Sequence, residues 1–211
     1  MRVGELSSRT GIPVPTIKYY LREGLLPAGE LTCPNQAQYG EPHIRRLKLV
    51  RALVDVGGLS IAAARQVLGA LDSPDVPLHT TLGVARRAAG PPAPAGPCRS
   101  GPSWQRAVDE ADEWLRQRGW RVDPNGPARA SLAQLLLTLR ELGQDDLLGM
   151  LDEYAAAAER LAAAELALVG RQPDPDGRLQ AAVLGTVLGD TLLVTLRRLA
   201  QEDACRREFA V

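Results

Sequence analysis

A run of thirteen residues near the middle of the chain limits what the whole chain can fold into. Residues 90–102 read GPPAPAGPCRSGP, so proline or glycine fills eight of these thirteen positions. Proline lacks a backbone N–H donor and resists regular structure, so neither a helix nor a central strand is expected to pass through this segment. The sequence therefore predicts two folded parts joined by a linker at 90–102.

The segments on both sides of this linker carry helical patterns. Before the linker, glycine, serine and proline residues at helix ends predict short helices over residues 3–10, 14–23, 41–56, 60–71 and 75–89. After it, apolar residues at helical spacing predict helices over 103–118, 127–142, 145–169 and 177–202. The turn-rich segment 25–40 has room for a small hairpin with arms at 31–32 and 38–39. The predicted fold class is all-α with a small β wing.

Charge is unevenly distributed, although the chain holds 25 basic and 25 acidic side chains. Residues 1–71 carry nine Lys and Arg against five Asp and Glu, whereas residues 103–211 carry 13 Arg against 18 Asp and Glu. A basic part joined to an acidic part is typical of a chain that binds a polyanion. On charge alone, an ordinary solvated surface is the simpler explanation.

Composition argues against several classes of protein. Cys33, Cys98 and Cys205 lie far apart, which predicts neither a disulfide framework nor a metal site. No nucleophile with its base, phosphate loop or HExxH motif is present, so we expect no enzyme and no cofactor. The uncharged apolar stretch 179–189 is shorter than the roughly 20 residues of a membrane span. Without a signal-peptide pattern either, we expect a cytoplasmic protein that has no membrane partner.

Residues 14–22 carry the most specific pattern in the chain. On a helix, the apolar side chains share one face, namely Ile17, Tyr20 and Leu21. The opposite face holds the candidate DNA contacts Pro15, Lys18, Tyr19 and Arg22, and the Thr16 hydroxyl is a further candidate. A short helix, a tight turn at 11–13 and a second helix with a free polar face are typical of a helix-turn-helix, whose second helix enters the major groove. Lys18 and Arg22 suit phosphates or guanine edges.

Further short segments extend this pattern from Arg2 to Leu71. They read VGEL in the first helix, TGI at the turn, TIKYY and REGLLP in and after the second helix, and RRL and GGLSI farther on. Together they resemble the MerR family of bacterial transcription regulators. The resemblance implies a winged helix-turn-helix domain over residues 1–71 and a homodimer that bends and untwists promoter DNA for RNA polymerase. It also implies that an effector changes this distortion.

The wing departs from the family's pattern. The family usually has Gly-Tyr-Arg-x-Tyr there, and the aligned residues 35–39 read NQAQY, so the wing arginine is missing. The resemblance implies DNA contacts by Gln36, Gln38 and Tyr39, but a glutamine amide releases no counterion, which predicts a weaker salt dependence. Basic residues of the next helix are candidates to compensate, and Arg45 is the DNA contact that we expect among Arg45, Arg46, Lys48 and Arg51.

Two alternatives are open for the dimer contact. The resemblance implies a long dimer helix after the DNA-binding domain, but prolines 74 and 77 and Gly90 leave only a short connecting helix within 72–89. The predicted helix 177–202 is apolar on nearly every side, with Gly185 and Gly189 four residues apart. Such a helix belongs in a subunit interface or in the middle of a bundle.

Residues 103–211 are predicted to form a helical bundle that senses an effector or holds the dimer. An organic effector between its helices would meet the candidate residues Trp104, Trp114, Trp120, Tyr154 and Asp190. The simpler alternative is that these aromatics are core and that Asp190 is paired. The predicted function is a sequence-specific DNA-binding regulator that responds to an organic effector. The alternative function is an effector-independent DNA-binding dimer with a structural or protein-interaction C-terminal domain.

Overall fold

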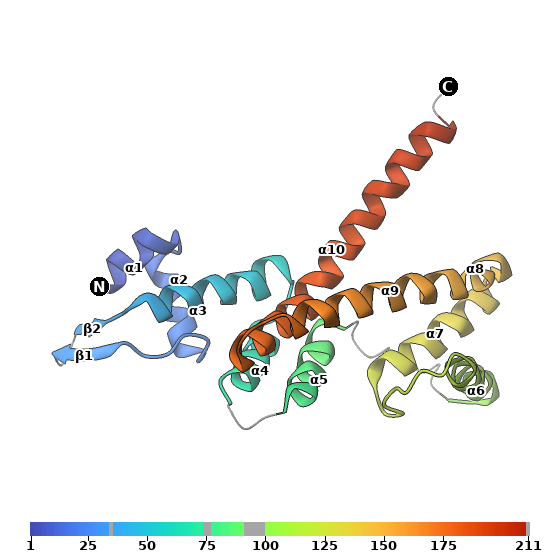
Figure 1. Cartoon of the computed structure of the whole chain (residues 1–211), viewed down its shortest axis with the longest axis horizontal. Coiled ribbons are helices and arrows are strands. Elements are labelled where there is room, and N and C mark those ends of the chain that lie inside the picture. Colours follow the sequence, from blue (N-terminus) through green and yellow to red (C-terminus); the bar gives the residue numbers. More distant parts are fainter. Residues whose placement is uncertain (34–35, 74–76, 91–99, 210–211) are drawn as a thin grey trace. The chain divides into compact units, whose positions relative to one another are not determined.

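The computed structural model describes residues 1–33, 36–73, 77–90 and 100–209 (Figure 1). Contacts divide the chain into two compact units, Met1–Ala89 with Leu168–Val211, and Gly90–Ala167. We call the first the DNA-binding unit, after the helix-turn-helix that the sequence predicts in it, and the second the inserted unit. This division differs from the predicted single domain at 103–211, because the last helix packs with the first unit. Most of the predicted linker, residues 91–99, lies outside the described residues.

The DNA-binding unit is helical with a single small hairpin among its described residues. Its elements are α1 (Val3–Thr10), α2 (Val14–Arg22), β1 (Glu30–Cys33), β2 (Gln36–Gln38), α3 (Glu41–Arg51), the π-helical turn η1 (Ala52–Val56), α4 (Ile61–Leu71), α5 (Leu78–Ala89) and α10 (Pro175–Phe209). The two strands are antiparallel, and Leu31 pairs with Ala37. The predicted fold class, all-α with a small β wing, is confirmed.

Local sequence explains where the helices of this unit begin and end. Gly11 follows α1 in the left-handed conformation (φ 70°) that a glycine adopts without strain, and its N–H donates to the Ser7 carbonyl. Ser60 caps α4, because its hydroxyl oxygen accepts from the backbone N–H of Ala63 at 3.2 Å. The ends of α1 and α4 agree with the predicted helices 3–10 and 60–71 to within one residue.

One apolar core joins the two sequence segments of the DNA-binding unit. Leu6, Ile17, Leu47 and Leu53 are fully buried in it. The first half of α10 completes this core, because its Val183 and Val187 are also buried there while the helix packs against α5, α4 and η1. The distal half runs on beyond α4 and α5 with its leucines exposed (Figure 1). Of the two predicted environments, the middle of a bundle describes the first half of this helix, and a subunit interface stays a prediction for the exposed distal half.

Helix α10 also corrects the expectation about membrane spans. By length and composition, Pro175–Glu208 could cross a membrane, with a mean hydropathy of 1.6 over its most apolar 18 residues, and 17% of that window is buried. The uncharged stretch 179–189 ends before Asp190, whereas the apolar pattern continues beyond this residue through Leu192, Leu193 and Leu196. Ala182, Val183 and Val187 are buried apolar residues of this helix.

The inserted unit is built on a pair of helices, α6 (Pro102–Gln117) and α7 (Pro127–Glu141), followed by α8 (Asp145–Gly149) and most of α9 (Leu151–Gly170). Its core is small, with Ala107, Ala111, Ala133, Leu136 and Leu137 as the buried residues. The predicted single helix 145–169 is wrong in one respect, since α8 ends at Gly149 and α9 begins at Leu151. Glycine is a poor helix former, which favours the break there.

Candidate nucleic-acid interface

Helix α2 has the two faces that the sequence predicts. Ile17 and Tyr20 are buried, whereas Pro15, Lys18 and Arg22 are exposed. Thr16 and Tyr19 are half-buried, and the Arg22 guanidinium carbon lies 6.0 Å from the centre of the Tyr19 ring. The exposed face therefore presents two cations, one of them beside a tyrosine.

The turn before α2 is held by hydroxyl hydrogen bonds. Ser7 Oγ donates to the Ile12 carbonyl at 2.6 Å, and Thr10 Oγ1 donates to the Leu6 carbonyl at 2.7 Å. Ile12 itself is 4% exposed and belongs to the core. Because both ends of the turn are tied to buried residues, α1 presents α2 in one orientation.

Tyr20 is a core residue despite its hydroxyl. It is 6% exposed, and burial raises the pKa of its hydroxyl above the ordinary value of 10.0, with a further rise from the negative charge of Asp55. The hydroxyl is therefore neutral at neutral pH. Tyr20 supports α2 from behind and takes no part in the exposed face.

The basic residues of α3 divide into two groups. Arg46 is turned inward, where its Nε donates to the Leu25 carbonyl at 2.8 Å and its two Nη atoms donate to Asp72 at 2.7 and 2.6 Å. Arg51 pairs with Asp55 at 3.1 Å. Arg45 and Lys48 are exposed, and no ion pair to either is found within the described residues. Of the four candidates to compensate for the wing, only Arg45 and Lys48 have their charge available.

The wing holds its predicted residues in different environments. Gln36 and Gln38 are exposed on β2, but Tyr39 is only 9% exposed and meets His43 edge-on at 5.1 Å between ring centres. The Tyr39 backbone also exchanges two hydrogen bonds with Met1. Tyr39 anchors the wing to the core, so its burial does not support the predicted DNA contact by this ring.

Four of the five predicted ligand residues do not line the hollow of the inserted unit that holds Trp120. Trp104 packs against the α6–α7 core, and Tyr154 is 44% exposed. Trp114 and Trp120 meet edge to face at 5.6 Å, with the Arg118 guanidinium 5.5 and 5.9 Å from their ring centres. Asp190 belongs to the other compact unit, where lost hydration raises its pKa. The predicted set is not gathered at one place.

The tryptophan pair forms a clasp between the end of α6 and α9. Trp120 Nε1 donates to Glu159 at 2.7 Å, and Arg118 pairs with Glu159 at 3.2 Å and with Asp152 at 2.9 Å. These bonds from Arg118 and Trp120 lower the pKa of the Glu159 carboxyl below its ordinary value of 4.5. The clasp therefore gives these aromatics a structural role in joining the end of α6 to α9.

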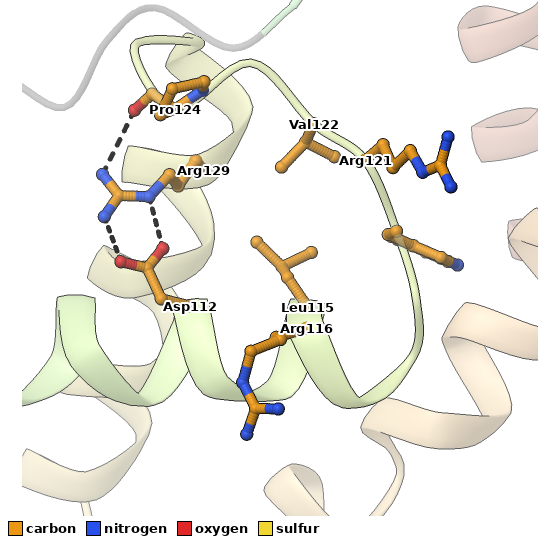
Figure 2. Close-up of a pocket in the computed structure, with 8 residues that line it drawn as sticks. Asp112, Leu115, Arg116, Arg121, Val122, Pro124 and Arg129 are labelled. Carbon is orange, nitrogen blue, oxygen red and sulfur yellow. Dashed lines mark hydrogen bonds and ion pairs between the residues drawn. The ribbon is translucent and has the colours of Figure 1, made fainter.

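Trp120 is the predicted ligand residue that does line a hollow. The hollow has a volume of about 230 Å³. The apolar part of its wall is formed by Leu115, Val122 and Pro124 (Figure 2). Arg129 bridges Asp112 and the Pro124 carbonyl on one side. The guanidinium groups of Arg116 and Arg121 point away from the hollow. The inner wall of the hollow is therefore mainly apolar, and the ion pair between Arg129 and Asp112 lies at its edge.

Comparison with known proteins identifies the family of the N-terminal domain. Residues 1–71 match the family model described as "MerR HTH family regulatory protein". The whole chain also superposes on the crystal structure of the "putative transcriptional regulator SCO5550 from Streptomyces coelicolor A3(2)", with 34% identity, a TM-score of 0.71 and coverage of 100% of this chain and 99% of that one. The chain carries a MerR-family helix-turn-helix domain over residues 1–71.

Curated relatives match part of the chain. The "HTH-type transcriptional regulator ZntR homolog" of Haemophilus influenzae is 40% identical over 50 residues, which is 24% of this chain and 37% of the relative. The "Mercuric resistance operon regulatory protein" of Bacillus cereus is 31% identical over 71 residues, which is 34% of this chain and 53% of the relative. The matched segments thus span between about a third and about half of these two relatives. Residues 1–71 thus form a DNA-binding domain of the kind that MerR-type transcriptional regulators carry.

Proposed function

We propose that this chain acts in the cytoplasm as a homodimer that places two α2 helices in successive major grooves of promoter DNA. The observation that carries the proposal is the exposed face of α2, where Lys18 and Arg22 stand opposite the buried Ile17 and Tyr20. Base edges are read by such side chains, while hydroxyls and amides position the protein on phosphates. The proposed contacts are Pro15, Thr16, Lys18, Tyr19, Arg22, Gln36, Gln38 and Arg45.

A second copy of the chain is the proposed cover for the distal half of α10. Leu192, Leu193, Leu196 and Leu199 are 59, 48, 54 and 56% exposed. A helix of 35 residues is about 52 Å long, whereas the 12 residues of α5 reach only about 18 Å. Continuous exposed apolar surface marks an interaction site, and α10 offers far more of it than α5 does. We therefore propose that α10, and not the short α5, supplies most of the dimer contact.

The proposed action on transcription follows from the dimer. Two recognition helices fixed at one spacing bend and untwist the DNA between them, at an energetic cost that depends on its sequence. A promoter whose polymerase elements are badly spaced would be brought into register by this distortion. RNA polymerase bound at that promoter is then the third partner, beside the DNA and the second copy.

An organic effector is proposed for the hollow beside Trp120. Its volume of about 230 Å³ is below the roughly 300–1,000 Å³ of drug-sized sites, which favours a small apolar molecule. In a screen of such compounds against the full chain, we expect a binder to quench tryptophan fluorescence and to change DNA affinity, because an effector must distinguish two states. The quenching is expected to disappear in Trp120→Phe and to persist in Trp104→Phe. If no compound has either effect, the alternative of an effector-independent dimer with a structural inserted unit stands.

Loss of the Arg22 guanidinium tests the assignment of α2. We expect Arg22→Ala to weaken specific DNA binding by about 1–3 kcal/mol for each base-edge contact removed. The melting temperature should stay unchanged, because the side chain is exposed and its guanidinium lies beside the half-buried Tyr19. The matched control is Arg160→Ala, an exposed arginine of the inserted unit. Equal DNA affinity of the wild type and Arg22→Ala, measured by fluorescence anisotropy, would remove α2 as the recognition helix.

A further inference from the structure

The wing has no cation of its own. Residues 30–39 read ELTCPNQAQY, so neither lysine nor arginine is present and Glu30 adds a negative charge. Glu30 and Leu31 are exposed on β1, and Gln36 and Gln38 are exposed on β2. A surface of this kind repels DNA phosphates or binds them by neutral hydrogen bonds alone. If the wing contributes electrostatic affinity, the charge has to come from a neighbouring segment.

The amino-terminal residues are held against the base of the wing. The Met1 amino group donates to the Tyr39 carbonyl at 2.9 Å, and the Tyr39 N–H donates to the Met1 carbonyl at 2.9 Å. This reciprocal pair is the hydrogen-bonding pattern of neighbouring antiparallel strands. Arg2 continues in extended backbone (φ −82°, ψ 165°) before α1 begins. The first two residues therefore extend the wing at its base.

This arrangement carries the Arg2 guanidinium to β2. Its Nη2 donates to Gln36 Oε1 at 3.2 Å, and both side chains are exposed. A guanidinium has five N–H donors, and this bond uses one of them. No carboxylate of the described residues forms an ion pair with Arg2. The remaining donors and the full positive charge face solvent at the wing.

We propose that Arg2 is the phosphate-binding cation of the wing, replacing from the amino terminus the arginine that the strands lack. The proposal rests on the proposed DNA-binding function. Gln36 acts as its positioning residue, because its amide oxygen holds the guanidinium on β2. Arg46 and Arg51 on α3 are bound to Asp72 and Asp55. Arg45 and Lys48 also stand on α3, make no ion pair within the described residues and would contribute independently of the wing.

The salt dependence of DNA binding tests this proposal. The full chain is measured on a duplex that it selects from random DNA. The negative slope of log K against log salt concentration should become less steep in Arg2→Gln, by about 0.9 for each protomer bound or about 1.8 for a dimer. Arg2→Lys retains the charge and should retain the wild-type slope. Arg160→Gln, which removes an exposed charge from the inserted unit, should also leave the slope unchanged. Melting temperatures check folding, since the Met1–Tyr39 bonds do not use the Arg2 side chain.

The outcomes separate this proposal from the function on which it rests. A wild-type chain that binds no DNA at low salt overturns the proposed function and the role of Arg2 with it. A wild type that binds DNA while Arg2→Gln keeps the same slope overturns the Arg2 assignment alone. A slope that falls equally in Arg2→Lys and Arg2→Gln also overturns it, because the charge would then not be the cause.

Discussion

Gly57→Ala is expected to destabilise the DNA-binding unit by about 1–3 kcal/mol, the usual cost of forcing an added methyl group into a packed core. A Cβ on Gly57 would lie 2.4 Å from Val187 Cγ1 and 2.8 Å from the Leu53 carbonyl oxygen. The carbonyl belongs to the π-helical turn η1 and cannot rotate away as a long side chain can. The loss should be visible as a lower urea midpoint of unfolding with an unchanged slope.

A matched control is available in the same unit. Gly69 lies in α4, and a Cβ there would meet nothing within 4 Å. Gly69→Ala should therefore be neutral or stabilising by up to about 1 kcal/mol, the helix-propensity difference between the two residues. If Gly57→Ala were as stable as Gly69→Ala, the close packing of η1 against α10 would be contradicted. The same contact between η1 and α10 includes a hydrogen bond from the Thr191 hydroxyl to the Val56 carbonyl at 3.3 Å.

The double variant Leu192→Asp with Leu196→Asp is expected to be monomeric and to lose DNA affinity by about 10²-fold or more, because the second half-site no longer binds at high effective concentration. The two leucines are one turn apart on α10 and exposed, so the charges disrupt association without entering the core. Sedimentation reports the oligomeric state and fluorescence anisotropy reports the affinity.

The control for this variant places the same charges elsewhere. Leu135 and Leu142 of the inserted unit are 60 and 65% exposed. Leu135→Asp with Leu142→Asp should leave both dimerisation and DNA binding intact. A Leu192→Asp, Leu196→Asp chain that sediments as a dimer would exclude the distal half of α10 as the contact.

The local part of the fold was predictable from the sequence, and the long-range part was not. Helical spacing and Gly11 predicted α1 and α2, together with the burial of Ile17 and Tyr20, because these features depend on neighbours within a few residues. The all-round apolar pattern of α10 left core and interface open. Helix α10 packs against α5, which lies about ninety residues earlier in the chain. The periodicity of a helix does not indicate which distant segment covers its apolar face.

The candidate site shows the same division. Exposure of Lys18 and Arg22 follows from the period of one helix. The inward turn of Arg46 depends on Asp72, which is 26 residues away, and the position of Arg2 depends on Gln36, which is 34 residues away. No motif signals such pairs. Tyr39 was expected at the DNA because of its place in the family's wing, while its packing on His43 follows from tertiary structure.

The most direct test of the account is the DNA sequence that the wild-type chain selects from a random library, followed by hydroxyl-radical footprinting of the bound DNA. The account predicts an enriched quasi-palindromic sequence with two protected half-sites, whose centres are separated by about one helical turn or a multiple of it. It also predicts that Arg22→Ala loses the preference at particular base pairs within each half-site. Enrichment of no sequence, or a preference that is unchanged in Arg22→Ala, would contradict the claim that paired α2 helices read promoter DNA.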